Sequence, residues 1–240
     1  MRTDIIKEAI TRVSGCDSGK WHLSDDMEFT VAGNVFPLLP WRFDRRLLTI
    51  RKLAIEDNVL RKICSYKSRI VGKCSDNLRK ILYQELDVCE WLLNDKIVSV
   101  YAQKNGEKIL SLILKTKKDI LCSIEIALTL SENTPPVTKH EISGKEGLIS
   151  DRSINEQIPV EAIYVFEQTT KKPEVYTDMD VTMLGLNPEE IMIADNIIAW
   201  FKNAPDLNIL QKTTDRINYL ADCVFQSVKI SDTVKTEEER

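Results

Sequence analysis

The spacing of hydrophobic residues divides the chain into helical and alternating stretches. Residues 97–167 mostly follow a period of two, which is typical of strands with one buried face. The clearest case is residues 120–130, where six alternate positions are apolar while Ser123, Glu125 and Thr129 occupy the other face. The other predicted strands are 29–36, 97–102, 108–115, 137–143, 148–154 and 160–167. Amphipathic helices are predicted for 3–13, 41–60, 78–93, 188–201 and a last stretch that starts near Thr214.

Short polar turns separate the predicted strands. They contain Asn105-Gly106, Asn133 to Pro136, and Gly144 to Gly147, which carry residue types that favour tight turns. Because such short connections join neighbouring strands that run in opposite directions, the sequence favours an antiparallel sheet. A chain of 240 residues with 43% apolar content can bury a substantial core, and we expect one large domain.

Two helix starts and a disordered end are predicted from local sequence. Asn187 is the candidate cap of the helix at 188–201, with Pro188 in its first turn. Thr214 is the candidate cap of the last helix. Residues 232–240 carry charge without apolar partners, so we expect this tail to be disordered.

Charge and cysteine content argue against several classes of partner. The 33 basic and 37 acidic side chains are interspersed, and the net charge of -4 gives no reason to expect nucleic acid or an anionic membrane. The six cysteines form neither a C-x-x-C pair nor a zinc spacing, so we expect reduced, mostly buried thiols and no metal. A cytoplasmic location is expected, because we find no secretory signal and no run of roughly 20 apolar residues.

The glycine-containing segments do not match a nucleotide-binding loop. Residues 15–20 place three residues between their glycines, and Trp21 stands where a P-loop needs Ser or Thr. No G-x-G-x-x-G occurs, and Gly144 and Gly147 fall between two predicted strands, where we expect them to permit positive φ in a hairpin. No cofactor is therefore predicted.

Side chains able to act as acids or bases are few. His22 and His140 lie in polar, loop-like surroundings, and we expect both at the surface rather than in a nucleophilic triad. Glu85 and Glu90 are expected to be solvated charges of their helix, an expectation that holds less well for Asp87.

A cluster of aromatic and basic residues follows Pro40. Residues 41–46 combine two aromatic rings with three guanidinium groups. Arg suits bidentate contact with a carboxylate or phosphate, and Trp offers a face to a sugar. The cluster could equally anchor the start of a helix with its charges exposed, and both interpretations stay open.

Four segments, in the same order along the chain, resemble the glucose-fructose oxidoreductase / inositol dehydrogenase (Gfo/Idh/MocA) family. Residues 78–102 resemble its D-x-G-x-H-x-x-D helix, W-L-x-G turn and following strand, of which Asp87 and Trp91-Leu92-Leu93 are kept. The other three resemble its R-F-x-P segment with helix and crossover strand, its I-x-G-x-x-G-x-x-x-D hairpin and its closing helix pair, and they span 39–71, 139–151 and 197–231.

This resemblance implies a fold and a domain organisation. The fold class is α+β, with an open, predominantly antiparallel β-sheet, helices packed on one face and a dimer interface on the other. Residues 29–231 correspond to the family's C-terminal α/β domain. Residues 1–28 would be an N-terminal helix and loop that could be the stub of a lost Rossmann domain, and residues 232–240 the tail.

The residues that carry the family's chemistry are replaced. Laid on its motif, the catalytic Asp falls on Lys80, the Gly on Leu82 and the proton-transferring His on Gln84. A primary amide does not titrate near neutral pH, so Gln84 cannot take that proton. The family's Lys-Pro dipeptide has no counterpart, because Lys172-Pro173 lies in a late loop. No catalytic residue is predicted. A vestigial substrate pocket is expected near Arg42, Lys80, Gln84 and Asp87.

The expected role is therefore non-catalytic. The chain would be a stand-alone relative of an oxidoreductase C-terminal domain, acting as a dimerising partner or regulatory subunit of a sugar or polyol dehydrogenase. Its partner would be a second copy or a full-length oxidoreductase. Alternatively, it completes the substrate site of an NAD(P)-dependent oxidoreductase whose cofactor domain is on another chain, or it is a binding module for a sugar or sugar nucleotide.

Overall fold

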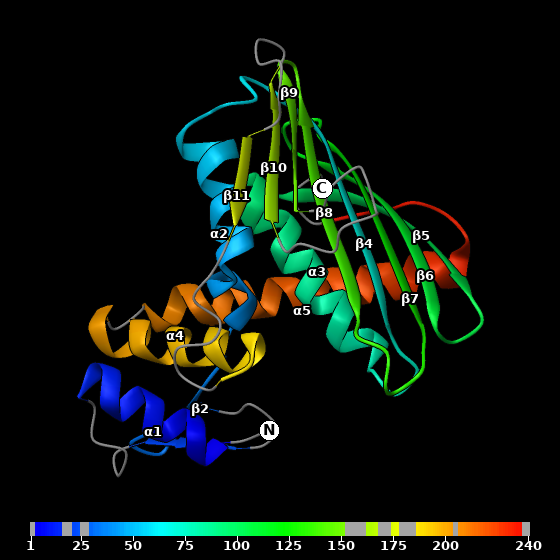
Figure 1. Cartoon of the computed structure of the whole chain (residues 1–240). Coiled ribbons are helices and arrows are strands. Elements are labelled where there is room, and N and C mark those ends of the chain that lie inside the picture. Colours follow the sequence, from blue (N-terminus) through cyan, green and yellow to red (C-terminus); the bar gives the residue numbers. More distant parts are fainter. Residues whose placement is uncertain are drawn as a thin grey trace. The chain divides into compact units, whose positions relative to one another are not determined.

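The protein is described here by a computed structural model. It describes the residues 3–15, 21–24, 29–151, 162–167, 174–177, 186–203 and 206–236. The chain forms two compact units, Met1–Leu48 with Asp178–Arg216, and Thr49–Thr177 with Ile217–Arg240 (Figure 1). The boundaries expected at residues 28 and 231 do not coincide with the limits of these units and stay predictions.

The first unit combines helices with a small sheet. Its described elements are α1 (Thr3–Ser14), β1 (Trp21–Leu23), β2 (Phe29–Val31), β3 (Asn34–Phe36), η2 (Pro40–Phe43) and α4 (Pro188–Asn203). The predicted strand at 29–36 is a hairpin, because Ala32 and Gly33 both adopt positive φ and reverse the chain. Apolar side chains of α1 and α4, such as Ile6 and Ile197, pack with the aromatic rings of the small sheet.

The start of α4 has the cap predicted from the sequence. The side-chain oxygen of Asn187 accepts the backbone N–H of Glu190 at 2.9 Å. In return, the Glu190 carboxylate accepts the backbone N–H of Asn187 at 2.9 Å. Two backbone donors that the helix itself leaves unpaired are thus satisfied.

The cap predicted for the last helix is wrong. Helix α5 spans Leu207–Ile230, and Thr214 lies inside it with its hydroxyl donating to the carbonyl of Leu210 at 3.1 Å. Asp206 takes the capping role, because its carboxylate accepts the backbone N–H of Asn208 at 2.9 Å. The helix therefore begins earlier than its apolar pattern indicates.

The second unit is built on a large sheet. The described strands lie in the order β11-β10-β9-β8-β4-β7-β6-β5-β12, and within this order only β4 and β7 pair in parallel. The predicted open, predominantly antiparallel α+β fold is thus confirmed. The strands are β4 (Ile63–Lys73), β5 (Ile97–Asn105), β6 (Ile109–Thr116), β7 (Leu121–Leu130), β8 (Val137–Gly144), β9 (Gly147–Ser150), β10 (Ala162–Glu167), β11 (Glu174–Thr177) and β12 (Val234–Lys235).

The ends of the sheet differ from the expectation. Strand β9 stops at Ser150, and the predicted continuation to 154 lies outside the described residues. Strand β11 is not predicted by the hydrophobic pattern. Residues Val234–Lys235, expected in the disordered tail, instead pair with β5, and the hydroxyl of Thr236 donates to the carbonyl of Ile97 at 3.0 Å.

Helices cover one face of the sheet. Figure 1 shows α3 (Leu78–Leu93) lying along the strands, and its apolar residues are buried together with every second side chain of β6 and β7. Asn77 sets the start of α3, because its side chain accepts the backbone N–H of Lys80 at 3.1 Å. Asn94, in the left-handed region, ends the helix. The predicted limits of α3 are confirmed.

The predicted helix at 41–60 is interrupted. It consists of η2, the α-helix α2 (Arg45–Arg51) and the π-helical turn η3 (Lys52–Glu56).

Within the described part of the chain, no helix is long and apolar enough to cross a membrane.

The β8–β9 hairpin depends on Gly144 for a different reason than predicted. Gly144 pairs with Gly147, but neither is among the described glycines with positive φ. A Cβ atom at Gly144 would lie 2.5 Å from the Cβ of Leu60 and 2.7 Å from the carbonyl oxygen of Lys62. The glycine is therefore needed for the close approach of a neighbouring loop.

We predict that Gly144→Ala lowers the free energy of unfolding by about 1–3 kcal/mol, because the methyl group must displace backbone atoms. Urea unfolding followed by circular dichroism measures the change. Ser143→Ala, at the preceding residue of the same strand, is the control and should change stability much less. Equal stability of Gly144→Ala and the wild type would contradict the close approach.

Candidate functional site

Three of the four residues expected in a vestigial pocket lie on α3. Lys80, Gln84 and Asp87 follow helical spacing and share one side of the helix. Lys80 is exposed, Gln84 is half-buried and Asp87 is fully buried. Arg42 belongs to η2 in the first unit, so the common pocket stays a prediction.

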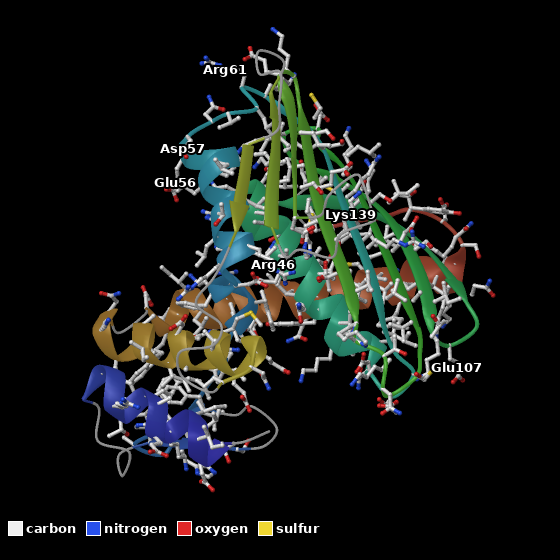
Figure 2. All side chains as sticks on the ribbon, in the orientation of Figure 1. Arg46, Glu56, Asp57, Arg61, Glu107 and Lys139 are labelled. Atoms are coloured by element: carbon white, nitrogen blue, oxygen red, sulfur yellow. The ribbon has the colours of Figure 1, made fainter. Side chains whose placement is uncertain are left out.

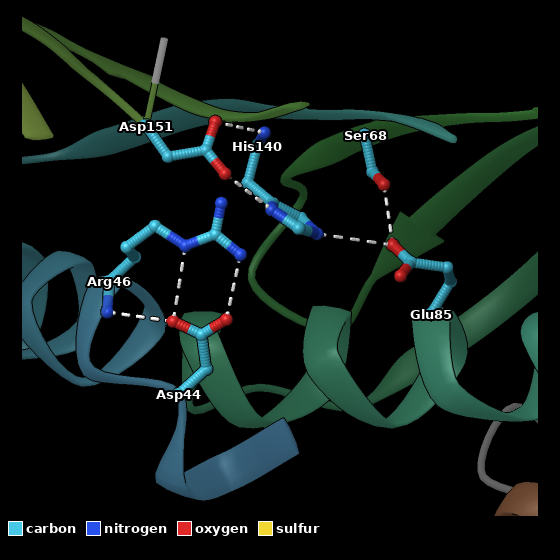
Figure 3. Close-up of polar contacts among 6 residues, drawn as sticks. All are labelled: Asp44, Arg46, Ser68, Glu85, His140 and Asp151. Carbon is cyan, nitrogen blue, oxygen red and sulfur yellow. Dashed lines mark hydrogen bonds and ion pairs between the residues drawn. The ribbon is translucent and has the colours of Figure 1, made fainter. Parts of the chain in front are cut away.

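The aromatic and basic cluster at residues 41–46 caps a helix. The Asp44 carboxylate accepts the backbone N–H of Arg46 at 2.8 Å and its guanidinium at 2.9 and 3.3 Å (Figure 3). Trp41 is buried. Asp44 and Arg46 thus anchor the start of α2, although both are half-buried rather than exposed, and the ligand interpretation of the cluster stays a prediction.

The two histidines differ in exposure. His22 is exposed, as predicted, but the surface position predicted for His140 is wrong, because this side chain on β8 is only 4% exposed. The Nδ1 atom of His140 lies 2.8 Å from one carboxylate oxygen of Asp151, whose other oxygen accepts the backbone N–H of His140 at 2.7 Å (Figure 3). Asp151 follows β9 directly, so this pair links the end of β9 to the middle of β8.

A second carboxylate approaches the other side of the imidazole. Glu85 of α3 lies 3.4 Å from Nε2 of His140, and it accepts a hydrogen bond from the hydroxyl of Ser68 on β4 at 2.5 Å. The prediction of a solvated Glu85 is wrong. We call Ser68, Glu85, His140 and Asp151 the buried quartet; each of these side chains is buried.

Glu90 is also buried rather than solvated. Its carboxylate accepts the backbone N–H of Ile97 at 2.9 Å and pairs with the ammonium of Lys96 at 2.8 Å. Helical spacing alone shows neither which strand a glutamate faces nor which hydrogen-bond donors it meets, so the sequence does not predict the burial of either residue.

The buried quartet holds a proton firmly. Burial lowers the pKa of His140, but the charge of Glu85 and the hydrogen bond to Asp151 outweigh it and raise the pKa to about 10. The imidazole is therefore cationic at neutral pH, with no lone pair for general base catalysis. The neighbouring Tyr66 phenol has its pKa raised by its burial and by the negative charge of Glu85.

The quartet contains the residue types of a hydrolase triad in a different arrangement. Ser68 donates to Glu85 rather than to the imidazole, so the imidazole does not activate the hydroxyl as it does in a triad. The members come from β4, α3, β8 and the residue after β9. Their role in this geometry is to join the covering helix to three parts of the sheet.

The opposite face of the sheet is open and carries a charged depression. A hollow of about 280 Å³ is lined by polar and charged residues of β4, β7 and β8: Lys67, Ser68, Arg69, Ser123, Glu125, Lys139 and Glu141. Figure 2 labels Lys139 among the side chains of β8. Glu141 is 3.1 Å from Lys139, and Glu125 is 3.7 Å from Arg69.

The thiols show no metal or disulfide chemistry in the described residues. Of the five described cysteines, Cys89, Cys122 and Cys223 are buried, whereas Cys64 and Cys74 are exposed, and none of the five is in a disulfide. The described part of the chain also contains no group of three or more His, Cys, Asp or Glu side chains placed to hold a metal ion.

Comparison with known proteins identifies the fold. No family model and no curated protein matches the chain. Among solved structures, it is similar to levoglucosan dehydrogenase in complex with NADH and levoglucosan, with 14% identity and a TM-score of 0.65, covering 83% of this chain and 66% of that one. It is also similar to aldose-aldose oxidoreductase from Caulobacter crescentus, complexed with glycerol, with 12% identity, a TM-score of 0.60 and 82% and 62% coverage.

A third similar structure is an oxidoreductase from Agrobacterium radiobacter in complex with NAD+, L-tartaric acid and magnesium, with 11% identity, a TM-score of 0.60 and 82% and 63% coverage. The chain has the fold of Gfo/Idh/MocA-type oxidoreductases. The resemblance predicted from the sequence is thus confirmed at the level of the fold. The chain spans less than two thirds of the length of these proteins.

The turn that leads from β4 into α3 does not fit the phosphates of a dinucleotide. The Asp76 carboxylate accepts the backbone N–H of Lys73 at 2.7 Å, so a negative charge already lies in the turn. A Cβ atom at Gly72 would lie 2.8 Å from an Asp76 carboxylate oxygen, so there is no open space beside this glycine. Asn77 occupies a backbone donor of the first helical turn.

We predict that the His140 network stabilises the fold less as the pH rises. The folded-state pKa of about 10 exceeds the ordinary value of 6.5. The contribution of His140 to the free energy of unfolding, about 5 kcal/mol, is therefore complete below pH 6.5 and is lost as the pH rises through 10. His140→Gln leaves two buried carboxylates without their cation, and it should be about 3–5 kcal/mol less stable near pH 6.

Urea unfolding at a series of pH values from 6 to 10 measures this difference. The gap in free energy between the wild type and His140→Gln should narrow as the pH rises. His22→Gln is the matched control, because His22 is exposed, and its gap should stay near zero. A constant gap for His140→Gln would mean that the imidazole is neutral in the folded protein.

Proposed function

We propose that this chain is a non-catalytic partner or regulatory subunit of a sugar or polyol dehydrogenase, and that it assembles through the open face of its sheet. The observation that carries the proposal is the composition of α3. Gln84 stands where the oxidoreductase motif has its titratable His, and Lys80 where it has Asp. An amide cannot exchange a proton with a sugar hydroxyl near neutral pH.

The packing of α3 supports a chain that keeps the fold of these oxidoreductases without their catalytic residues. Leu82, at the glycine of the motif, is fully buried and contributes to the core. Asp87, the acid kept from the motif, is fully buried as well. The quartet around His140 keeps its proton at neutral pH and offers no substitute base.

The open face of the sheet supports the assembly. Exposed apolar side chains lie there beside the charged depression, namely Ile109 and Ile113 of β6 and Leu121 of β7. Soluble proteins seldom leave apolar side chains together on a sheet face unless a partner covers them. Ala127 lies on the same face and is half-buried, in register with Val71 and Ile109.

We predict that the 240-residue chain does not bind NADH, because the turn into α3 is occupied by its own carboxylate and amide. Titration of NADH fluorescence measures binding. A triple variant with Lys80→Asp, Leu82→Gly and Gln84→His should also be inactive on sugars and polyols, since the chain still has no binding site for the hydride acceptor. Saturable micromolar binding of NADH would overturn the non-catalytic role.

We predict that Ala127→Arg dissociates the assembly, because a cation buried in the middle of the interface without a counter-ion costs several kcal/mol. Light scattering measures the mass in solution. Glu107→Arg, in the exposed turn after β5, is the control and should keep the wild-type mass (Figure 2). The open face is not the interface if Ala127→Arg assembles like the wild type.

A further inference from the structure

The last described residues of the chain cover one edge of the large sheet. After α5 the chain turns back and pairs with β5, and β12 is the outermost described strand on this side (Figure 1). In this pairing Val234 lies opposite Val100, and Lys235 lies opposite Ser99. We call residues 232–236 the edge strap. Without the edge strap, β5 would present unpaired backbone groups to any extended segment nearby.

Alternate side chains of the edge strap contact the sheet. Val234 is 8% exposed and Thr236 is fully buried, whereas Lys235 between them is exposed. The backbone N–H of Thr236 donates to the carbonyl of Val98 at 2.9 Å, and its hydroxyl donates to the carbonyl of Ile97 at 3.0 Å. The edge of β5 therefore fits a Val-x-Thr pattern, through one apolar contact and one hydroxyl contact.

Ser227 of α5 limits how far an extended segment can pair along β5. Its fully buried hydroxyl accepts the backbone N–H of Ala102 at 2.9 Å and donates to the carbonyl of Asp232 at 2.6 Å. The helix thus satisfies the next backbone donor of the edge. The site therefore ends at Ala102, and a segment of the length of the edge strap fills it.

The edge strap is weakly held for an edge strand. Strand β12 has two residues, whereas strands in globular proteins usually have about five or six. Ser231, directly before the edge strap, has a φ of 54°, in the left-handed region that is unfavourable for residues other than Gly, Asn and Asp. Detachment relieves this conformation and breaks few hydrogen bonds, so the edge can open without unfolding of the sheet.

We propose that the edge of β5 is a strand-addition site for an extended segment of another protein with the pattern Val-x-Thr, and that the edge strap occupies this site in the single chain. In strand addition, main-chain hydrogen bonds supply affinity and contacts of alternate side chains supply specificity. The short tether to α5 keeps the edge strap at a high effective concentration, so a partner's segment has to compete with it. This contact is separate from the assembly through the open face.

The test uses the full chain and a fluorescent peptide with the sequence of residues 231–240. The edge strap competes with the peptide, so a change that weakens the edge strap should make the site available. Val234→Asp in the chain replaces a buried apolar contact with a charge. We expect this variant to lower the dissociation constant of the peptide at least about 10-fold relative to the wild type, measured by fluorescence anisotropy.

Thr233→Asp is the matched control, because it introduces the same charge at an exposed position of the edge strap. Its dissociation constant for the peptide should stay near the wild-type value. A second peptide, with Asp at the positions of Val234 and Thr236, should bind none of these chains.

Thr236→Val is a milder variant that removes only the hydroxyl and keeps the volume of the side chain. It should lower the dissociation constant of the peptide by about 3- to 10-fold, because a single hydrogen bond is lost from the edge strap. Circular dichroism checks the folding of each variant, and Thr236→Val decides the outcome if Val234→Asp does not fold.

Two results would overturn the inference. One is that the folded variants bind the peptide no more tightly than the wild type does. The other is that the peptide with two Asp residues binds as well as the peptide with the natural sequence. Neither result bears on the proposed function, which fails instead if the chain binds NADH or if Ala127→Arg leaves every assembly intact.

Discussion

The structure depends on the covering of one face of the large sheet by α3 while the other face stays open. Side chains alternate between the two faces, so each strand must supply apolar residues at one set of positions and solvent-compatible residues at the other. Strand β7 shows this directly: Cys122, Ile124 and Ile126 are buried, whereas Leu121 and Glu125 are exposed. The covered face supplies most of the core of this unit, and the open face keeps charged and apolar side chains at the surface.

Polar groups on the covered face are tolerated because they satisfy one another. A cationic His140 between Glu85 and Asp151 compensates for part of the desolvation of both carboxylates, and Ser68 donates a further hydrogen bond. Removing the imidazolium would leave two buried carboxylates without their cation, so the network holds the helix and the strands in one arrangement. Because these contacts raise the pKa of His140, its imidazole keeps its proton at neutral pH and is unsuitable as a base.

Helix α3 keeps the features that hold it in the fold, whereas other positions of the motif differ. The features that hold the helix in place are kept: the cap at Asn77, the left-handed end at Asn94 and the buried carboxylate of Asp87. At the positions that align with the catalytic Asp and His of the family's motif, the chain has Lys80, which is exposed, and Gln84, which is half-buried. Packing constrains the buried side of a helix, whereas its reactive side can change at little cost in stability.

The sequence by itself determined the local structure: the period-two strands, the limits of α3, the Asn187 cap of α4 and the fold class. The fold class follows from the resemblance to the oxidoreductase family, and the other features from side-chain spacing and capping, which act within a few residues. Only the tertiary structure decided the parallel pairing of β4 with β7, the burial of His140 and Glu85 and the close approach at Gly144. Each of these depends on residues far apart in the chain, and no local pattern records which groups will meet.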